Sequence, residues 1–183
     1  MVVIGAGFTG LSTALHLAEA GEILVSDSLI DAGADDALAV SAPLARLTAD
    51  RVTIAGRIET GEMDLSDTIV TGRATARERF RGCLRFCLVG PGSETPHRHR
   101  VLESEEGPGG QPIRAPFLSR DRMDPAWLRL DPAGDARILA GASDGGEMGA
   151  FNAARLGELM AGLAQRLAEH TPAGLRTGIV VRL

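Results

Sequence analysis

Three stretches between residues 22 and 72 share one pattern of apolar and polar positions. Each has apolar residues, a small residue directly before an aspartate, and then a β-branched or leucine-rich pair. A glycine follows five or six residues after each aspartate. The aspartates are Asp27, Asp50 and Asp67, and the glycines are Gly33, Gly56 and Gly72. Short strands with glycine corners that recur about every twenty residues are typical of a parallel β-solenoid, in which each coil stacks on the next.

The pattern predicts a mainly β fold, a short parallel β-solenoid with coils over residues 22–89. Helical patterns of about 10–15 residues do not separate these strands, so a βαβ sheet fits poorly, and a β-sandwich is the alternative. We expect Asp27, Asp50 and Asp67 to be corner residues whose carboxylates accept backbone N–H bonds. As an alternative, they line a groove as the paired acids of a glycoside hydrolase.

Residues 1–21 predict a strand, a glycine-rich turn and a helix, in that order. Residues 1–4 are apolar, Gly5, Gly7 and Gly10 form a GxGxxG motif, and residues 11–20 have helical spacing before Gly21. Such glycines let a backbone approach a pyrophosphate at a helix N-terminus. This segment resembles the N-terminus of FAD-dependent oxidoreductases of the amino-acid oxidase type. The resemblance implies FAD binding through the three glycines, and Asp27 has the spacing of the acid that binds ribose hydroxyls. In a solenoid, the same strand–turn–helix unit would cover the first coil.

Cysteine and histidine residues lie close together between residues 83 and 99. Cys83 and Cys87 are followed by His97 and His99, and this spacing matches no common zinc motif. We therefore assign no metal site and expect a buried thiol pair near two exposed imidazoles. Residues 90–116 are rich in Pro, Gly, Glu and Ser, which predicts a long flexible loop.

Residues 117–183 predict a turn-rich region, a helix over residues 151–170 and a final strand over 178–183. Trp127 is expected to anchor the turns to the core. Asp144 and Glu147 precede the helix, where acidic groups complement its dipole. The apolar stripe of the helix is expected to pack on the core or to cap an end of the solenoid. Its members are Phe151, Leu156, Leu159, Met160, Leu163 and Leu167.

A second resemblance covers most of residues 22–183. It is carried by Asp67-Thr-Ile-Val-Thr-Gly72 and by segments 82–93 and 142–151. These resemble the C-terminal part of poorly characterised bacterial proteins with β-helix repeats, some of them linked to phage-tail-like contractile systems. The resemblance implies the end of a right-handed β-helix and no established catalytic residues. The segment 90–116 departs from the pattern of those proteins.

The composition excludes several classes of function. The chain has 183 residues, and all 19 basic residues are Arg, with no Lys and no Tyr. The lack of Lys excludes a Walker-type phosphate site and Schiff-base chemistry. A net charge of -5 argues against nucleic acid or an anionic membrane as the main partner. No apolar run reaches the roughly 18 residues of a membrane span, and residues 1–20 lack the basic start of a signal peptide. We therefore expect a cytoplasmic location.

These patterns favour a non-enzymatic structural or scaffold module, a fragment of a larger bacterial protein that has a protein partner or belongs to a larger assembly. No catalytic residue and no cofactor are assigned to it. The alternative function is that of a truncated FAD-dependent oxidoreductase, which would bind FAD through Gly5, Gly7, Gly10 and Asp27.

Overall fold

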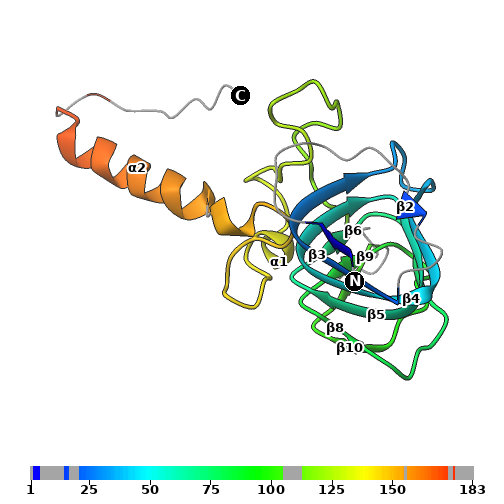
Figure 1. The fold of residues 1–183 in the computed structure, drawn as a ribbon. Coiled ribbons are helices and arrows are strands. Elements are labelled where there is room, and N and C mark those ends of the chain that lie inside the picture. The colour runs from blue at the N-terminus through cyan, green and yellow to red at the C-terminus, as the bar shows by residue number, and fades with distance from the viewer. Residues whose placement is uncertain are drawn as a thin grey trace.

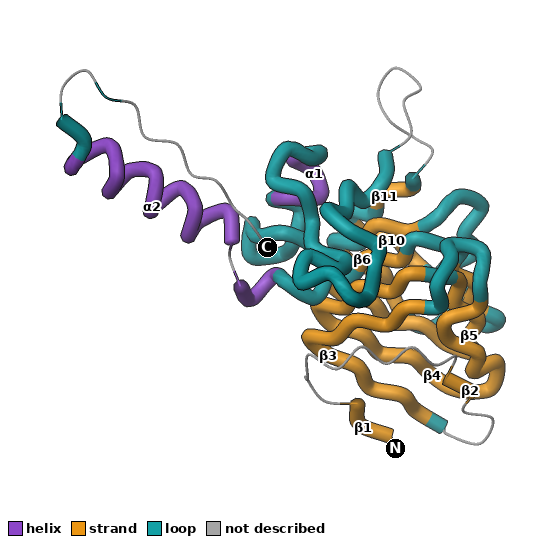
Figure 2. Tube along the Cα trace, turned by 90° about the horizontal axis from the view of Figure 1, so that it is seen from above, coloured by secondary structure: helices purple, strands orange, loops and turns teal. Residues whose placement is uncertain are grey.

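The computed structural model describes residues 2–4, 15–16, 21–104, 113–154, 156–172 and 175. The chain forms a parallel sheet wound into a β-solenoid of about four turns, as the repeat predicts, with a helix near the C-terminus (Figures 1 and 2). The strands are β1 (Val2–Ile4), β2 (Leu15–His16), β3 (Glu22–Asp31), β4 (Leu38–Ala55), β5 (Arg57–Ser66), β6 (Ile69–Val70), β7 (Ala74–Ala76), β8 (Cys83–Arg85), β9 (Leu88–Val89), β10 (His97–His99) and β11 (Leu102–Glu103). The helices are α1 (Ala136–Leu139), a 3-10 turn (Asn152–Ala154) and α2 (Leu156–His170).

The coils turn through three stacked faces, because the long strands bend and continue from one face to the next. Face A stacks β1, residues 22–26, 46–50 and 62–66, β8 and β10. Face B stacks residues 28–31 and 52–55 with β6, β9 and β11. Face C stacks β2 with residues 40–42 and 58–60 and β7. All of these pairings are parallel, so residues at one position of successive coils become direct neighbours.

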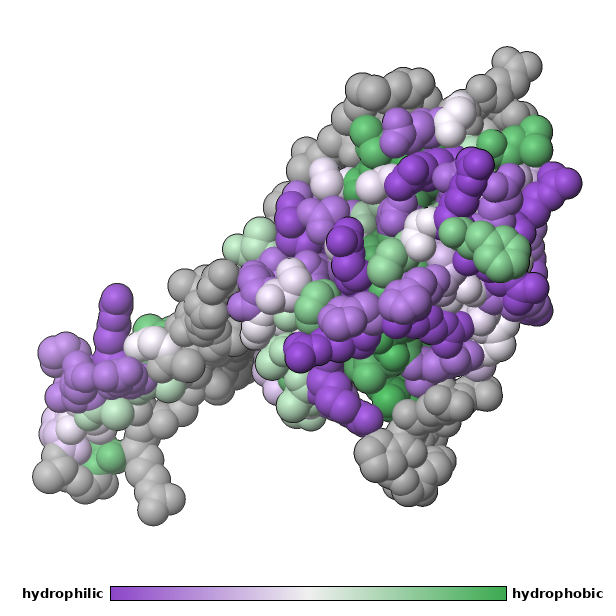
Figure 3. Space-filling model, turned by 90° about the horizontal axis from the view of Figure 1, so that it is seen from below, coloured by the Kyte–Doolittle hydropathy of each residue, from purple (hydrophilic) through white to green (hydrophobic). Residues whose placement is uncertain are grey.

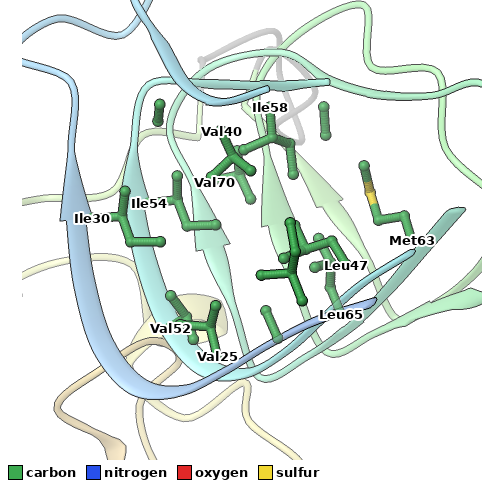
Figure 4. Close-up of a cluster of buried hydrophobic side chains, with 14 of the residues drawn as sticks. Val25, Ile30, Val40, Leu47, Val52, Ile54, Ile58, Met63, Leu65 and Val70 are labelled. Atoms are coloured by element: carbon green, nitrogen blue, oxygen red, sulfur yellow. The ribbon is translucent and has the colours of Figure 1, made fainter. Parts of the chain in front are cut away.

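Side chains on the inner side of each face fill the space that the coils enclose (Figure 4). Alternation along each strand sends every second residue inward, and Leu47, Ile54, Ile58 and Leu65 have no exposed surface. Burying one such aliphatic side chain contributes about 1.5–3 kcal/mol. A core made of Val, Ile, Leu, Met and Ala follows from a sequence with only six aromatic residues, five Phe and one Trp.

A column of left-handed residues forms the corner between faces A and B. The five stacked residues have φ between 45° and 53° and are separated by 24, 16, 19 and 14 residues along the chain. They are Asp27, Arg51, Asp67, Phe86 and Arg100. The predicted repeat therefore has the right strands, but its alignment of Asp50 with Asp27 is wrong by one residue. Asp50 pairs with Ser26 and Ser66 on face A, and Arg51 occupies the corner.

Face B is covered on its outer side by the segment 113–154. Ile69 and Leu88 point away from the solenoid interior and pack in a second buried cluster with Ile113, Ile138 and Met148. The pairs Ile69–Val70 and Leu88–Val89 are apolar at both positions, which is the pattern of a strand buried on both sides. The solenoid and this segment thus share a second core.

The N-terminal residues differ from the expected strand–turn–helix unit. Val2–Ile4 forms the predicted strand, and it pairs with the face A part of β3. Leu15–His16, expected inside a helix, forms a strand that pairs with Val40–Ser41 on face C. The edge of the first coil offers backbone donors and acceptors, and pairing satisfies them. Gly5, Gly7 and Gly10 lie outside the described residues.

Two further segments differ from expectation. The parallel stack continues past Val89, because β10 and β11 lie within the predicted loop 90–116, whose polar composition hid two short strands. Helix α2 begins at Leu156 and projects from the solenoid (Figures 1 and 2). From Gly162 to His170 its side chains are exposed except for half-buried Leu167, so this part neither joins the core nor caps the coils.

Segment 178–183, predicted as a strand, lies outside the described residues. No helix in the described part of the chain is both long and apolar enough to cross a membrane.

Candidate functional site

The three aspartates that the repeat singles out converge on one arginine. The guanidinium of Arg51 donates two hydrogen bonds to Asp27, from Nε at 2.6 Å and from Nη2 at 2.9 Å. Its Nη1 lies 2.5 Å from Oδ2 of Asp50. Arg51 stacks between Asp27 and Asp67 in the corner column, so its guanidinium interacts with carboxylates from three successive coils.

The two carboxyls that share Arg51 have opposite pKa shifts. The hydrogen bonds from Arg51 lower the pKa of Asp27 below its ordinary value, against a smaller opposing effect of burial. Burial raises the pKa of Asp50, and the charges of Asp67 and Asp27 raise it further, which outweighs the attraction of Arg51. The 2.5 Å contact of Asp50 with Arg51 would by itself predict a lowered pKa. Arg51 is already neutralised by its bidentate bond to Asp27, so its attraction does not offset burial and the repulsion from the other carboxylates, and the pKa of Asp50 stays raised.

Asp67 is engaged by the C-terminal segment. It is 5% exposed, and its two carboxylate oxygens accept bonds from the backbone N–H of Ser143 at 2.7 Å and from the Ser143 hydroxyl at 2.6 Å. Its backbone carbonyl accepts a further bond from the N–H of Gly149 at 2.7 Å. Asp67 therefore fastens the segment 113–154 to the corner of the solenoid.

The arrangement favours the structural role of these aspartates over the glycoside hydrolase alternative. A glycosidase needs one acid and one base that face a common substrate groove. Asp27 and Asp67 instead use both carboxylate oxygens in bonds within the chain. Asp50 is the most exposed of the three, with 41% of its side chain accessible, and its carboxylate pairs with Arg51.

The cysteines and histidines of residues 83–99 divide between two environments. Cys83 is half-buried on the outer side of face A, and its Sγ lies 3.9 Å from Nδ1 of exposed His97 on the next coil. Cys87 points into the core, where burial raises the pKa of its thiol to about 12. His99 stacks its ring edge-on against Phe86, with 5.5 Å between the ring centroids. The expected buried thiol pair is therefore wrong, because Cys83 lies on the outer side of face A and only Cys87 points into the core.

An open pocket of about 390 Å³ lies at the corner between faces C and A, beside residues 43–46, 61–62 and 77–78. One acid of its lining, Glu62, is held in two ion pairs within the chain. Glu62 pairs with Arg46 at 3.9 Å and with Arg81 at 2.8 Å. In Figure 3 hydrophilic side chains likewise dominate the visible face, and smaller hydrophobic areas lie between them. The pocket offers neither a buried acid nor a nucleophile.

Sequence reasoning did not find two residues that organise the corner, Arg51 and Ser143. Arg51 follows Asp50 directly, and nothing in its local pattern indicates that it lies between two aspartates from other coils. Ser143 is 76 residues from its partner Asp67. Only the stacking of coils and the return of the C-terminal segment bring these groups together.

Comparison of the chain with protein-family models, with curated proteins and with solved structures gives no match.

Proposed function

We propose that this chain is a non-enzymatic structural module of a larger assembly, and that α2 is its attachment element. The observation that carries the proposal is the engagement of all three candidate carboxylates by groups of the same chain. Residues used in this way stabilise contacts between coils and leave no prepared acid–base pair for a substrate.

Helix α2 supports the attachment role. It has 15 residues, a length at which an isolated helix is only marginally stable in water, and it projects from the solenoid (Figure 1). Leu163 is 45% exposed on this helix. A partner that covers Leu163 would stabilise the helix. A second copy of the chain presents the same helix, so two copies related by a twofold axis can cover each other.

Sedimentation velocity of the full chain over a range of concentrations tests this proposal. We expect concentration-dependent association that Leu163→Glu abolishes. Ala168→Glu is the matched control, because it adds the same charge at an exposed position of the same helix away from the leucines. A wild-type chain that stays monomeric at every concentration, or a Leu163→Glu variant that associates normally, would overturn α2 as the attachment element.

The alternative function, FAD binding, rests on the glycine motif of residues 5–10 and stays a prediction. The described residues do not favour it, since Leu15–His16 is a strand and both oxygens of Asp27 accept bonds from Arg51. Calorimetric titration of FAD into the folded chain separates the two functions. Saturable binding that Gly10→Glu removes would support an FAD site, and absence of heat would support the structural module.

A further inference from the structure

The stacking of the last two coils places a thiol beside an imidazole. β8 and β10 pair in parallel with Cys83 opposite His97 and Arg85 opposite His99. Leu84, which lies between Cys83 and Arg85 on β8, is fully buried, so its neighbour Cys83 points to the outer side of face A. His97 pairs with Cys83 and lies on the same side. Cys83 Sγ and His97 Nδ1 lie 3.9 Å apart.

This distance suits a metal ion held between the two atoms. Zinc binds thiolate sulfur at about 2.3 Å and imidazole nitrogen at about 2.0 Å, and the sum of about 4.3 Å exceeds the observed separation. One ion can therefore contact both atoms without movement of the backbone. Thiolate and imidazole are also the donors that borderline and soft metals prefer.

His99 is the third donor within reach. It lies two residues after His97 on the same strand, so both side chains start on the same side of the sheet, and both are exposed. Its ring packs against Phe86, and the described residues contain no converged group of three potential metal ligands. Rotation about χ1 of an exposed side chain is a small rearrangement between staggered states.

We propose that Cys83, His97 and His99 form a binding site for a single Zn²⁺ ion, with water completing the coordination. The other groups nearby are already engaged. The carboxylate of Asp64 accepts a bond from the backbone N–H of Cys83 at 2.9 Å and pairs with Arg46. Cys87 cannot join the site, because it is fully buried and its thiol donates to the carbonyl of Arg85 at 3.0 Å.

Titration of the reduced full chain with Co²⁺, an optical probe for zinc sites, tests the proposal. We expect one Co²⁺ per chain, a thiolate-to-cobalt charge-transfer absorption, and displacement of Co²⁺ by Zn²⁺. Cys83→Ser should abolish the absorption. His97→Ala and His99→Ala should each weaken Co²⁺ binding about 10-fold or more, because loss even of a group that only supports a ligand costs 10–100-fold.

The chain supplies matched controls for both residue types. Cys87→Ser and His170→Ala should keep the absorption and the affinity of the wild type, since the first lies in the core and the second at the end of α2. Because Cys87→Ser changes the core, wild-type protein alkylated by iodoacetamide at accessible Cys83 provides a second test, and it should lose the absorption while it stays folded by circular dichroism.

Absence of the absorption in the wild type, or its persistence in Cys83→Ser, would overturn the site. An unchanged affinity in His97→Ala or in His99→Ala would overturn the three-ligand assignment.

Discussion

The solenoid coils and the segment 113–154 are both compact, but they are held together in different ways. In the coils, residues far apart in the sequence pair through continuous parallel backbone hydrogen bonds, from β1 to β11. In segment 113–154 most backbone bonds are local turns, and strand-like contacts are limited to isolated bridges such as Phe117–Leu130.

In segment 113–154, aspartate side chains accept backbone hydrogen bonds that a strand ladder would otherwise satisfy. Five of them accept a bond from the backbone N–H two residues later, the arrangement of an Asx turn. They are Asp121, Asp124, Asp131, Asp135 and Asp144. The coils therefore accept Asp, Arg or Phe at the corner as long as the ladder continues, whereas segment 113–154 depends on individual side chains.

The largest expected effect concerns the core of the coils. Leu47 is fully buried and stacks between Ile23 and Met63, so Leu47→Ala should lower the free energy of unfolding by about 2–5 kcal/mol. At protein concentrations too low for association through α2, Leu163→Ala on the exposed helix should change it by less than about 0.5 kcal/mol. Urea unfolding of both variants measures the difference. Similar losses for the two would show that α2 is packed in solution.

One glycine in the coils and one in α2 should respond in opposite directions to substitution by alanine. A Cβ at Gly72 would lie 2.1 Å from the carbonyl oxygen of Asp35, so Gly72→Ala should lower the free energy of unfolding by about 1–3 kcal/mol. Gly162 in α2 has open space around it, and Gly162→Ala should raise helix stability by up to about 1 kcal/mol. Thermal unfolding monitored by circular dichroism checks both signs. A Gly72→Ala variant as stable as the wild type would contradict the close stacking of the glycine corners.

Asp67 joins the two regions, so its substitution should separate their stabilities. Asp67→Ala leaves the N–H of Ser143 without its acceptor and should cost about 1–3 kcal/mol. Asp67→Asn keeps one acceptor oxygen and tolerates the φ of 49°, so it should lose less. Hydrogen exchange should show faster opening of residues 113–154 in Asp67→Ala while β4 and β5 stay protected. Uniform loss of protection would mean that the two regions unfold together.

The smallest effect concerns the two acids that share Arg51. The lowered pKa of Asp27 means that its stabilisation is present above the unfolded value of 3.8 and is lost as pH falls through the lower folded value. The raised pKa of Asp50 means the reverse, since stability decreases as pH rises from 3.8 through its folded value.

At pH 7, therefore, Asp27→Asn should destabilise the chain and Asp50→Asn should stabilise it. Solvent screening limits each change to a few tenths of a kcal/mol. Urea unfolding at pH 7 and at pH 3 measures them, and both differences should shrink at the lower pH. A loss of stability in Asp50→Asn at pH 7 would show that its bond to Arg51 outweighs burial and repulsion.

Much of the solenoid could be predicted because its signals are local. Alternating apolar residues and spaced glycines indicate the coils, and the three repeat segments, residues 23–30, 46–54 and 63–70, fall on β3, on β4, and on β5 with β6. The prediction for Asp50 is wrong because the repeat matches residues of the same type, Asp with Asp. In the coils, residues of the same backbone conformation stack, and the left-handed corner accepts Asp, Arg or Phe once the ladders on both sides hold it.

The candidate sites could not be predicted in the same way. The contact between Cys83 and His97 spans 14 residues, and the bond between Asp67 and Ser143 spans 76. No short motif encodes these sequence separations, because each separation depends on the length of the loops between the faces.

Local signals in the chain specify the kind of coil. Alternation sends every second aliphatic side chain inward, and glycines stand where backbones stack closely. The tertiary structure decided which side chains meet across coils. Successive corner residues are separated by 24, 16, 19 and 14 residues, so neighbours in space have no constant spacing in the sequence. The ladder of parallel hydrogen bonds sets the register, and only that register places Arg51 among three aspartates and Cys83 beside His97.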